Sequence, residues 1–263
     1  MLDLFNPTQI PPLLWCLAAL GSVGFGLSKT GIPGVGILGV ALFAVVFKKS
    51  PGLALPLLIV ADFVAGYAYY KLAIWSKMFR MFPWAAIGIF IGFWVMGVIN
   101  EQPDKEVAAS TLNHIIGGIL IALVAVSIWW RWLRKTAVDP ETPDTQGLAF
   151  EIGVGVISGF TTMIANAAGP IMILYLLRMK LPKMQFIGTC SLFFLVLNCF
   201  KVPFMMYNGM ITMETMRVDL QFIPFSLLGA FVGWALIKKI NQALFESLCL
   251  GFTAVAAVWL VVK

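Results

Sequence analysis

The stretch GFGLSKTGIPGVG, residues 24–36, places Lys29 among five glycines and a proline, with apolar sequence on both sides. Glycine and proline interrupt helices, and an unpaired ammonium group is costly in an apolar environment. The chain is 60% hydrophobic and only 11% charged, whereas an average soluble domain has about 25% charged residues. Its apolar residues form runs of about 16 to 24, long enough to cross a bilayer as helices. The sequence therefore predicts an all-α polytopic membrane protein in which residues 24–36 interrupt a helix.

Polar breaks divide the apolar sequence into about ten segments, which we expect to cross or re-enter the membrane as helices. Their expected ranges are 10–28, 32–47, 52–70, 81–99, 111–133, 148–163, 168–180, 184–207, 218–237 and 243–262. The one long polar stretch lies at residues 134–147, near the middle of the chain. We therefore expect a first membrane repeat at residues 1–133, a cytoplasmic linker at 134–147 and a second membrane repeat at 148–263.

Matching glycine and proline positions indicate that the two halves are related. The pattern Pro-x4-Gly-x3-Gly begins at Pro83 and again at Pro224, 141 residues later; the breaks at residues 26–36 and 159–169 differ by 133. Chance is the alternative, since both residue types are common in membrane helices, but two matches in the same order favour duplication. We interpret the glycines that follow Pro83 and Pro224 as close helix contacts. Five segments per half predict inverted repeats, which are a transporter architecture.

Basic residues are distributed unevenly between the two expected sides of the membrane. If the N-terminus lies outside, the outer segments carry five basic residues and the cytoplasmic segments carry eleven. Cytoplasmic loops are enriched in Lys and Arg, so we expect an N-out, C-out topology. No cleavable signal peptide is evident, because the first nine residues contain no positive charge. The eleven are Lys71, Lys77, Arg80, Arg131, Arg134, Lys135, Arg178, Lys180, Lys183, Lys238 and Lys239.

Motifs for nucleotide, metal or catalytic sites are missing from the sequence. LSKTG lacks the glycine that precedes the lysine of a P-loop, and GVGILG at residues 34–39 lacks the strand and soluble βαβ unit of a dinucleotide site. The sequence has one histidine, His114, and no paired carboxylates. It therefore predicts no metal site, no cofactor and no enzymatic activity. The net charge of +6 lies in loops, so we expect no nucleic-acid partner. The four cysteines are interpreted as small buried hydrophobes, and a homo-oligomer is left open but not indicated.

The two glycine-rich breaks are the candidate binding site. Non-helical backbone is tolerated at membrane depth only inside protein or beside a water-filled cavity, and matching breaks in inverted halves indicate a central site. Glycines let backbone N–H groups approach a ligand, and the N-terminus of a following helix favours an anion. These features predict a small oxyanion as the substrate. Lys29 supplies a positive charge, and the neutral hydrogen-bonding candidates are Thr30, Thr161, Thr162 and Asn166.

Two further ionisable residues lie within apolar segments. Lys201 follows Asn198 on the same helical face, and a charge in the membrane core is a functional candidate because it is costly to place there. The alternatives are that Lys29 caps a helix end or reaches the interface, and that Lys201 reaches the interface or pairs with Asp62. Asp62 is the candidate proton carrier for coupling. Facilitated diffusion down the membrane potential is the alternative.

Three stretches resemble the TauE/SafE family of sulfite and organosulfonate exporters: GFGLSKTGIPGVGILGVAL (24–42), GVGVISGFTTMIANAAGPIMILYLL (153–177) and FIGTCSLFFLVLNCFKVPF (186–204). The resemblance implies a two-repeat helical bundle in the bacterial inner membrane that moves small sulfur-containing anions, usually outward. Alanines 165, 167 and 168 stand where family members often have glycine, which alters the size of the pocket or its ligand. The implied motif positions are Gly31, Pro33, Gly34 and Gly36, then Asn166, Gly169 and Pro170, followed by Asn198 and Lys201.

We therefore expect a secondary transporter that binds its anion near the midplane of the bilayer, between the two repeats. Sulfite or a short sulfonate such as sulfoacetate is the expected substrate, moving outward. One alternative is an importer or facilitator of sulfate, thiosulfate or another small anion. A membrane-embedded enzyme or assembly scaffold is the alternative of a different class.

Overall fold

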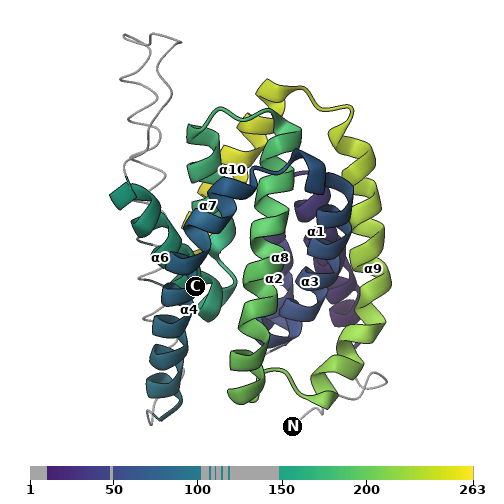
Figure 1. The fold of residues 1–263 in the computed structure, drawn as a ribbon. Coiled ribbons are helices and arrows are strands. Elements are labelled where there is room, and N and C mark those ends of the chain that lie inside the picture. Colours follow the sequence, from purple (N-terminus) through teal and green to yellow (C-terminus); the bar gives the residue numbers. More distant parts are fainter. Residues whose placement is uncertain are drawn as a thin grey trace.

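The computed structural model describes residues 11–47, 50–101 and 148–262, together with Val107, Ser110, His114 and Gly118. Every regular element in these residues is a helix (Figure 1). The expected segment at 111–133, apart from His114 and Gly118, and the linker at 134–147 lie outside the described residues. The helices are α1 (Pro12–Thr30), α2 (Gly36–Val46), α3 (Ser50–Tyr69), the short 3-10 helix η1 (Tyr70–Leu72), α4 (Trp75–Glu101), α6 (Leu148–Ala165), α7 (Ala168–Arg178), α8 (Lys183–Tyr207), α9 (Met213–Ile237) and α10 (Gln242–Val262).

Six of the described helices are long and apolar enough to cross a membrane: Pro12–Thr30, Pro51–Leu72, Trp75–Ile99, Leu148–Ala165, Lys183–Tyr207 and Met213–Ile237. By contrast, α2 and α7 have 11 residues each. At 1.5 Å per residue each is about 16 Å long, roughly half the thickness of the hydrocarbon core. Since α1 packs against α2 and α6 against α7, each pair is a helical hairpin with one short arm.

Two helices begin earlier than the sequence predicts. Helix α4 begins at Trp75 rather than at residue 81. Its first two turns include the polar residues Lys77 and Arg80, which lie outside the expected apolar segment. Helix α9 begins at Met213 rather than residue 218, after a capping box. In that box the Thr212 N–H donates to the Thr215 hydroxyl at 2.8 Å, and the Thr215 N–H donates to the Thr212 hydroxyl at 3.3 Å. Both hydrogen bonds satisfy backbone groups that a helix start leaves without intrahelical partners.

Glycines bring α1 and α9 into direct backbone contact. A Cβ atom at Gly26 would overlap the Ser226 carbonyl oxygen and the Ala230 amide of α9. In the opposite direction, a Cβ atom at Gly229 would overlap the Val23 carbonyl oxygen of α1. In lipid, where apolar surface provides little driving force between helices, such close approach increases van der Waals contact.

The same arrangement joins α4 to α6. A Cβ atom at Gly159 of α6 would overlap the Ala85 carbonyl oxygen, and one at Gly88 of α4 would overlap the Val156 carbonyl oxygen. The prediction that the glycines following Pro83 and Pro224 serve helix packing is therefore confirmed. Figure 1 shows α4 and α6 side by side at the left, with α1 and α9 together at the right.

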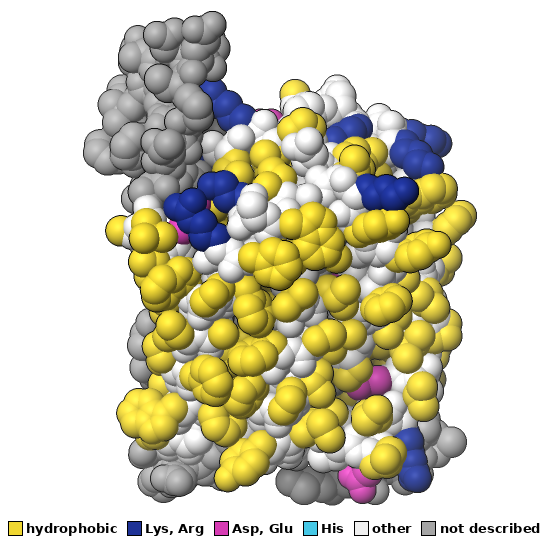
Figure 2. Space-filling view, in the orientation of Figure 1, with side chains coloured by type: hydrophobic (Ala, Val, Ile, Leu, Met, Phe, Trp, Pro, Cys, Tyr) yellow, Lys and Arg dark blue, Asp and Glu magenta, His cyan; other side chains and the backbone are white. Residues whose placement is uncertain are grey.

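The outer surface is divided into an apolar belt and charged ends. Figure 2 shows hydrophobic side chains over the flank of the bundle and Lys and Arg side chains gathered mainly at its upper end. The connections from α3 to α4, from α7 to α8 and from α9 to α10 lie at that end (Figure 1). Large apolar residues exposed on the described helices include Phe79, Trp94 and Phe231, which are 65%, 70% and 65% exposed. This distribution is typical of a multi-pass membrane protein.

The interpretation of the cysteines is partly wrong. Cys190 and Cys249 are buried, as expected, whereas Cys16 and Cys199 are exposed on the helix surface. In a membrane protein an apolar segment has a lipid-facing side as well as a core-facing side. Hydropathy does not distinguish the two.

Candidate functional site

A cavity of about 70 Å³ lies where the two helix breaks meet. One water needs roughly 10–15 Å³ by the same measure, so this cavity has room for a small oxyanion. Helices α1, α2, α3, α6, α7 and α8 contribute to its walls. Its lining in the described part of the chain consists of Ser28, Lys29, Pro33, Gly34, Gly36, Ile37, Val40, Leu58, Thr162, Asn166, Gly169, Pro170, Ile173, Ile187, Cys190, Ser191, Phe194 and Asn198.

Each helix break contains a residue in the left-handed backbone region. Gly34 has φ +104° in the turn between α1 and α2, and Asn166 has φ 52° between α6 and α7. Glycine adopts this region without a Cβ clash, and asparagine adopts it more readily than most residues. The Asn166 side chain also donates from Nδ2 to the Pro51 carbonyl at 2.9 Å, which holds the second break against α3. Both breaks turn the chain so that Gly36 and Gly169, in the first turns of α2 and α7, line the cavity.

The N-termini of α2 and α7 both face the cavity, and no side chain caps either of them. The residues at the two cap positions are Val35 and Ala167, whose apolar side chains accept no hydrogen bond. At α2 the Ile37 and Leu38 N–H groups already donate to the Gly34 and Val35 carbonyls, at 3.1 and 3.0 Å. The helix dipole nevertheless places partial positive charge at both N-termini. A small anion between the two N-termini would meet positive potential from both.

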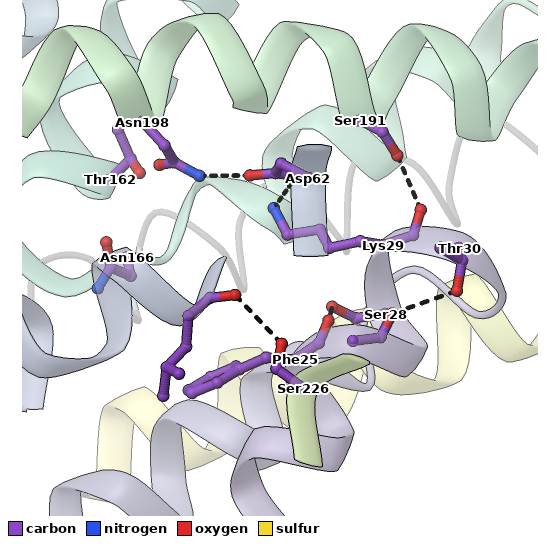
Figure 3. Close-up of polar contacts among 12 residues, drawn as sticks. Phe25, Ser28, Lys29, Thr30, Asp62, Thr162, Asn166, Ser191, Asn198 and Ser226 are labelled. Atoms are coloured by element: carbon purple, nitrogen blue, oxygen red, sulfur yellow. Dashed lines mark hydrogen bonds and ion pairs between the residues drawn. The ribbon is translucent and has the colours of Figure 1, made fainter. Parts of the chain in front are cut away.

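Lys29 adds a full positive charge to the cavity wall. It lies in the last turn of α1, and its side chain is 12% exposed. Its Nζ atom lies 2.8 Å from Asp62 Oδ1 on α3 and 4.3 Å from the centre of the Phe194 ring on α8. The other carboxylate oxygen, Asp62 Oδ2, accepts a hydrogen bond from Asn198 Nδ2 at 2.7 Å (Figure 3). The Ser191 hydroxyl donates to the Lys29 carbonyl at 2.7 Å, so α1, α3 and α8 are joined through polar groups.

Lys201 lies behind the cavity wall rather than in it. Its side chain is fully buried on α8. The Nζ atom donates to the Thr162 carbonyl at 2.9 Å, to Thr162 Oγ1 at 3.0 Å and to Asn166 Oδ1 at 2.6 Å. These hydrogen bonds tie α8 to the broken end of α6. Asp62 contacts Lys29 and Asn198, so the alternative that Lys201 forms a direct ion pair with Asp62 is wrong.

The Thr162 hydroxyl is oriented by this arrangement. Its oxygen accepts from Lys201, which leaves its own proton to donate elsewhere. Thr162 lines the cavity, so that proton is a candidate donor to a bound anion. Lys201 is therefore a positioning residue for Thr162 and Asn166.

The structure separates the predicted site residues into two groups. Three of those that do not line the cavity contact other helices or their own helix instead. Thr30 Oγ1 donates to the Ala230 carbonyl of α9 at 2.6 Å, a Cβ atom at Gly31 would lie 2.6 Å from Gly233 Cα, and Thr161 Oγ1 donates to the Ile157 carbonyl at 2.8 Å. The residues that line the cavity are Lys29, Gly34, Gly36, Thr162, Asn166, Gly169 and Asn198; those that do not are Thr30, Gly31, Thr161 and Lys201.

Sequence reasoning missed Ser28, Cys190, Ser191 and Phe194, which also line the cavity. A signal for the α8 residues is present in the sequence. Ser191, Phe194, Asn198 and Lys201 follow at intervals of three or four, which places them along one face of a helix. Extending the helical face that carries Asn198 and Lys201 toward the N-terminus of α8 would have identified Ser191 and Phe194.

A bundle of apolar helices enclosing a small cavity with an ammonium group and two helix N-termini defines a membrane protein with a candidate anion site. The chain belongs to the TauE/SafE family, described as sulfite exporters, whose match covers residues 16–260. It is also similar to a probable triacylglyceride transporter of Mycobacterium leprae (strain TN), with 30% identity over 79 residues. That match covers 30% of this chain and 16% of the relative. No solved structure matches the chain.

Proposed function

We propose that the protein is a secondary transporter that exports small sulfur-containing anions across the bacterial inner membrane. Sulfite and short organosulfonates such as sulfoacetate are the proposed substrates. The observation that carries this proposal is the convergence of Lys29 and two uncapped helix N-termini on one cavity of about 70 Å³. The family supports the choice of sulfur-containing anions. A triacylglyceride is far larger than this cavity, so the partial similarity to the mycobacterial relative does not favour a lipid substrate.

We further propose that residues 1–133 and 148–263 are inverted repeats. Gly26 and Gly159 are 133 positions apart. A Cβ atom added to either of them would overlap the backbone of a helix from the other half. The blocking carbonyls belong to Ser226 and Ala85, which differ by 141, the offset of the Pro-x4-Gly-x3-Gly pattern. If the likeness between the halves were accidental, the contact of Gly26 with Ser226 would not be expected to recur as the contact of Gly159 with Ala85. This agreement supports alternating access by rocking of one repeat against the other.

The third helix of each half supports the same relation. A Cβ atom at Gly52 of α3 would meet the Met210 backbone, and one at Gly188 of α8 would meet the Tyr69 backbone. Gly52 and Gly188 differ by 136 positions, as do Asp62 and Asn198. The hydrogen bond between these last two side chains therefore joins equivalent positions of the proposed repeats.

The proposed orientation is N-out and C-out. Its support is the position of the connections α3–α4, α7–α8 and α9–α10, which contain basic residues and lie at one end of the bundle (Figures 1 and 2). An anion that leaves an inside-negative cell gains about 2.3 kcal/mol per charge per 100 mV, which favours export without a coupled ion. Asp62 stays the candidate for proton coupling, because its carboxylate contacts the ammonium group of Lys29.

The second candidate function is uptake or facilitated diffusion of sulfate, thiosulfate or another small anion through the same cavity. A membrane-embedded enzyme or scaffold is the third, and it predicts substrate turnover or a stable partner without flux. Comparing inward with outward flux in liposomes that contain only this protein distinguishes the three.

The proposal is tested by sulfite and sulfoacetate flux in proteoliposomes. A hydrogen bond to a charged group contributes about 1.5–3 kcal/mol, so Lys29→Ala is expected to lower flux by about tenfold to a hundredfold. Lys201→Ala is expected to lower flux as well, by releasing Thr162 and Asn166. Lys239→Ala removes an exposed lysine at the basic end of the bundle and serves as the control. Undiminished flux in folded Lys29→Ala and Lys201→Ala protein would refute the proposed site.

A further inference from the structure

One buried carboxyl group takes no part in the candidate site. Asp219 lies in the second turn of α9 and is only 2% exposed. It does not line the cavity, and neither of its side-chain oxygens has a hydrogen-bond partner among the described residues. Its neighbours Val218 and Phe222 belong to a buried apolar cluster that joins α9 to α1, α2 and α3. Asp219 is therefore an unpartnered acid within apolar packing between the two halves of the chain.

The corresponding contact at the other end of the bundle provides a comparison. Glu151 is also buried, where α4 meets α6, but Lys77 Nζ and Arg80 Nε lie 2.9 Å and 2.5 Å from its carboxylate oxygens. Two cations therefore compensate that charge. At the offset of 141, the counterpart of Asp219 is Met78, which is 3% exposed. An apolar side chain fills the equivalent buried position in the first half, so packing there does not require a carboxyl group.

The charged residues of the helices that pack against α9 lie far from Asp219. Helices α1, α3 and α9 all run from the end of the bundle that holds the α8–α9 connection toward the basic end (Figure 1). The Ser226 hydroxyl donates to the Leu57 carbonyl at 3.2 Å, which fixes the register of α9 on α3. At 1.5 Å per residue, Asp62 then lies about 18 Å further along the bundle than Asp219. Lys29 of α1 lies beside Asp62.

The remaining titratable groups of these three helices are exposed or lie further away still. They are Cys16, Tyr67, Glu214 and Arg217, all exposed, and Tyr69, seven residues beyond Asp62. The helix α2 contains no titratable residue. Lys48 and Lys49, between α2 and α3, lie outside the described residues. A metal cation needs several oxygen ligands, and the described residues contain no group of three or more His, Cys, Asp or Glu side chains. A proton is therefore the ligand that suits Asp219.

We propose that Asp219 is a proton-binding site whose proton holds the outer end of the interface between the two repeats closed. This inference rests on the proposed function, which supplies the orientation and the rocking of the repeats. An ionised carboxylate without a partner is far more costly to bury than the neutral acid. Closure of α1 and α3 over Asp219 therefore requires that the carboxylate take up one proton from the outer water. Separation of α9 from α1 admits water and lets that proton leave.

Infrared spectroscopy of the purified full-length chain tests the bound proton directly. At neutral pH the unmodified protein should show the carbonyl band of a protonated carboxylic acid that Asp219→Asn lacks. Asp219→Leu should lack the band too, and it places no amide group in the apolar cluster. All other buried acids are shared by the three proteins, so the difference belongs to Asp219. Identical spectra in the carboxylic-acid region would overturn the inference.

Thermal unfolding gives a second measurement. In the unfolded chain an aspartate is ionised above about pH 4, so the folded protein holds one more proton and its stability falls as pH rises. From about pH 5 to about pH 8, well above that value, the melting temperature of the unmodified protein should fall relative to that of Asp219→Leu. Parallel changes in the two proteins would contradict the proposal.

Glu151→Gln is the matched control at a paired carboxylate. It should melt lower than the unmodified protein at both ends of this pH range, because it leaves Lys77 and Arg80 without their partner. Asp219→Leu should not melt lower at the acidic end, where it replaces a neutral acid. A clear loss of stability there would mean that Asp219 is ionised and paired, and the inference would be wrong.

Methanesulfonate flux in oriented proteoliposomes tests the effect on transport. The charge of this anion is constant over the same pH range, so a change in flux with external pH reports on the protein. One proton can shift the balance of open and closed states by up to about tenfold per pH unit. The unmodified protein should respond to external pH, and both Asp219 variants should lose that response. An equal response in all three would overturn the role of the proton. Absence of both sulfite and methanesulfonate flux in the folded, unmodified protein would instead refute the proposed function, whereas the infrared band would still support the proton site.

Discussion

Replacing Gly159 by alanine tests the backbone contact between α4 and α6. The added Cβ atom would lie 2.7 Å from the Ala85 carbonyl carbon and 2.9 Å from the Ile89 amide nitrogen, and closer still to the Ala85 oxygen. Carbon atoms pack best at about 3.5–4.0 Å, so α4 must retreat by about 1 Å. All three obstructing atoms belong to the backbone, and therefore no side chain can rotate to make room.

The expected loss of stability follows from two opposing effects. Overpacking of a close contact costs about 1–3 kcal/mol. Alanine is favoured over glycine within a helix by up to about 1 kcal/mol, which offsets part of that cost. We therefore expect Gly159→Ala to lower the free energy of unfolding by about 1–2 kcal/mol. Transport should fall too, because Thr162 lies one turn further along α6 and lines the cavity.

The assay is thermal unfolding of the purified protein in detergent, with sulfite flux measured in parallel. Gly153→Ala is the control on the same helix, since no described atom lies within 4 Å of its Cβ position. Gly153→Ala should match or slightly exceed the melting temperature of the unmodified protein, whereas Gly159→Ala should melt several degrees lower. Equal melting temperatures for the two variants would refute the contact. Gly26→Ala should behave like Gly159→Ala if the halves are inverted repeats.

Two further substitutions separate the function of the cavity from the stability of the fold. Gly169→Ala adds a methyl group to the cavity wall where no described atom lies within 4 Å. Its melting temperature should stay unchanged while sulfoacetate flux falls more than sulfite flux, and an equal effect on both anions would count against a size limit at this wall. Glu151→Gln removes a fully buried charge that lies 2.9 Å from Lys77 Nζ and 2.5 Å from Arg80 Nε. Thermal unfolding should show a loss of about 1–3 kcal/mol; a melting temperature equal to that of the unmodified protein would contradict this role.

The helices of this protein are largely predictable from sequence because they depend on local properties. A helix closes its own backbone hydrogen bonds, and a run of about 20 apolar residues crosses the bilayer regardless of its neighbours. The expected segments at 10–28 and 184–207 lie close to the observed α1 (Pro12–Thr30) and α8 (Lys183–Tyr207). The prediction was wrong where polar residues belong to a helix, as at the start of α4 and at the Thr212 capping box.

The candidate site is only partly predictable from sequence, because only some of its features depend on local properties. The breaks that contain Gly34 and Asn166 are visible because glycine, proline and asparagine mark interruptions within apolar segments. Thr30 was expected to bind substrate, yet its hydroxyl donates to the Ala230 carbonyl of α9. Helical periodicity shows which residues share a face with Lys29 or Lys201. It does not show which helix covers that face.

The sequence by itself determined the class of the protein, the positions of most helices and the two breaks, because apolar run length and helix-breaking residues act over a few turns. Only the tertiary structure decided which groups meet. Lys29 pairs with Asp62, 33 residues away, and Lys201 holds Thr162 from behind the cavity wall. Those contacts depend on the rotation and spacing of helices from both halves of the chain. Backbone packing at glycines such as Gly26 and Gly159 sets that spacing where α1 meets α9 and α4 meets α6, and no local pattern encodes the partner of a glycine.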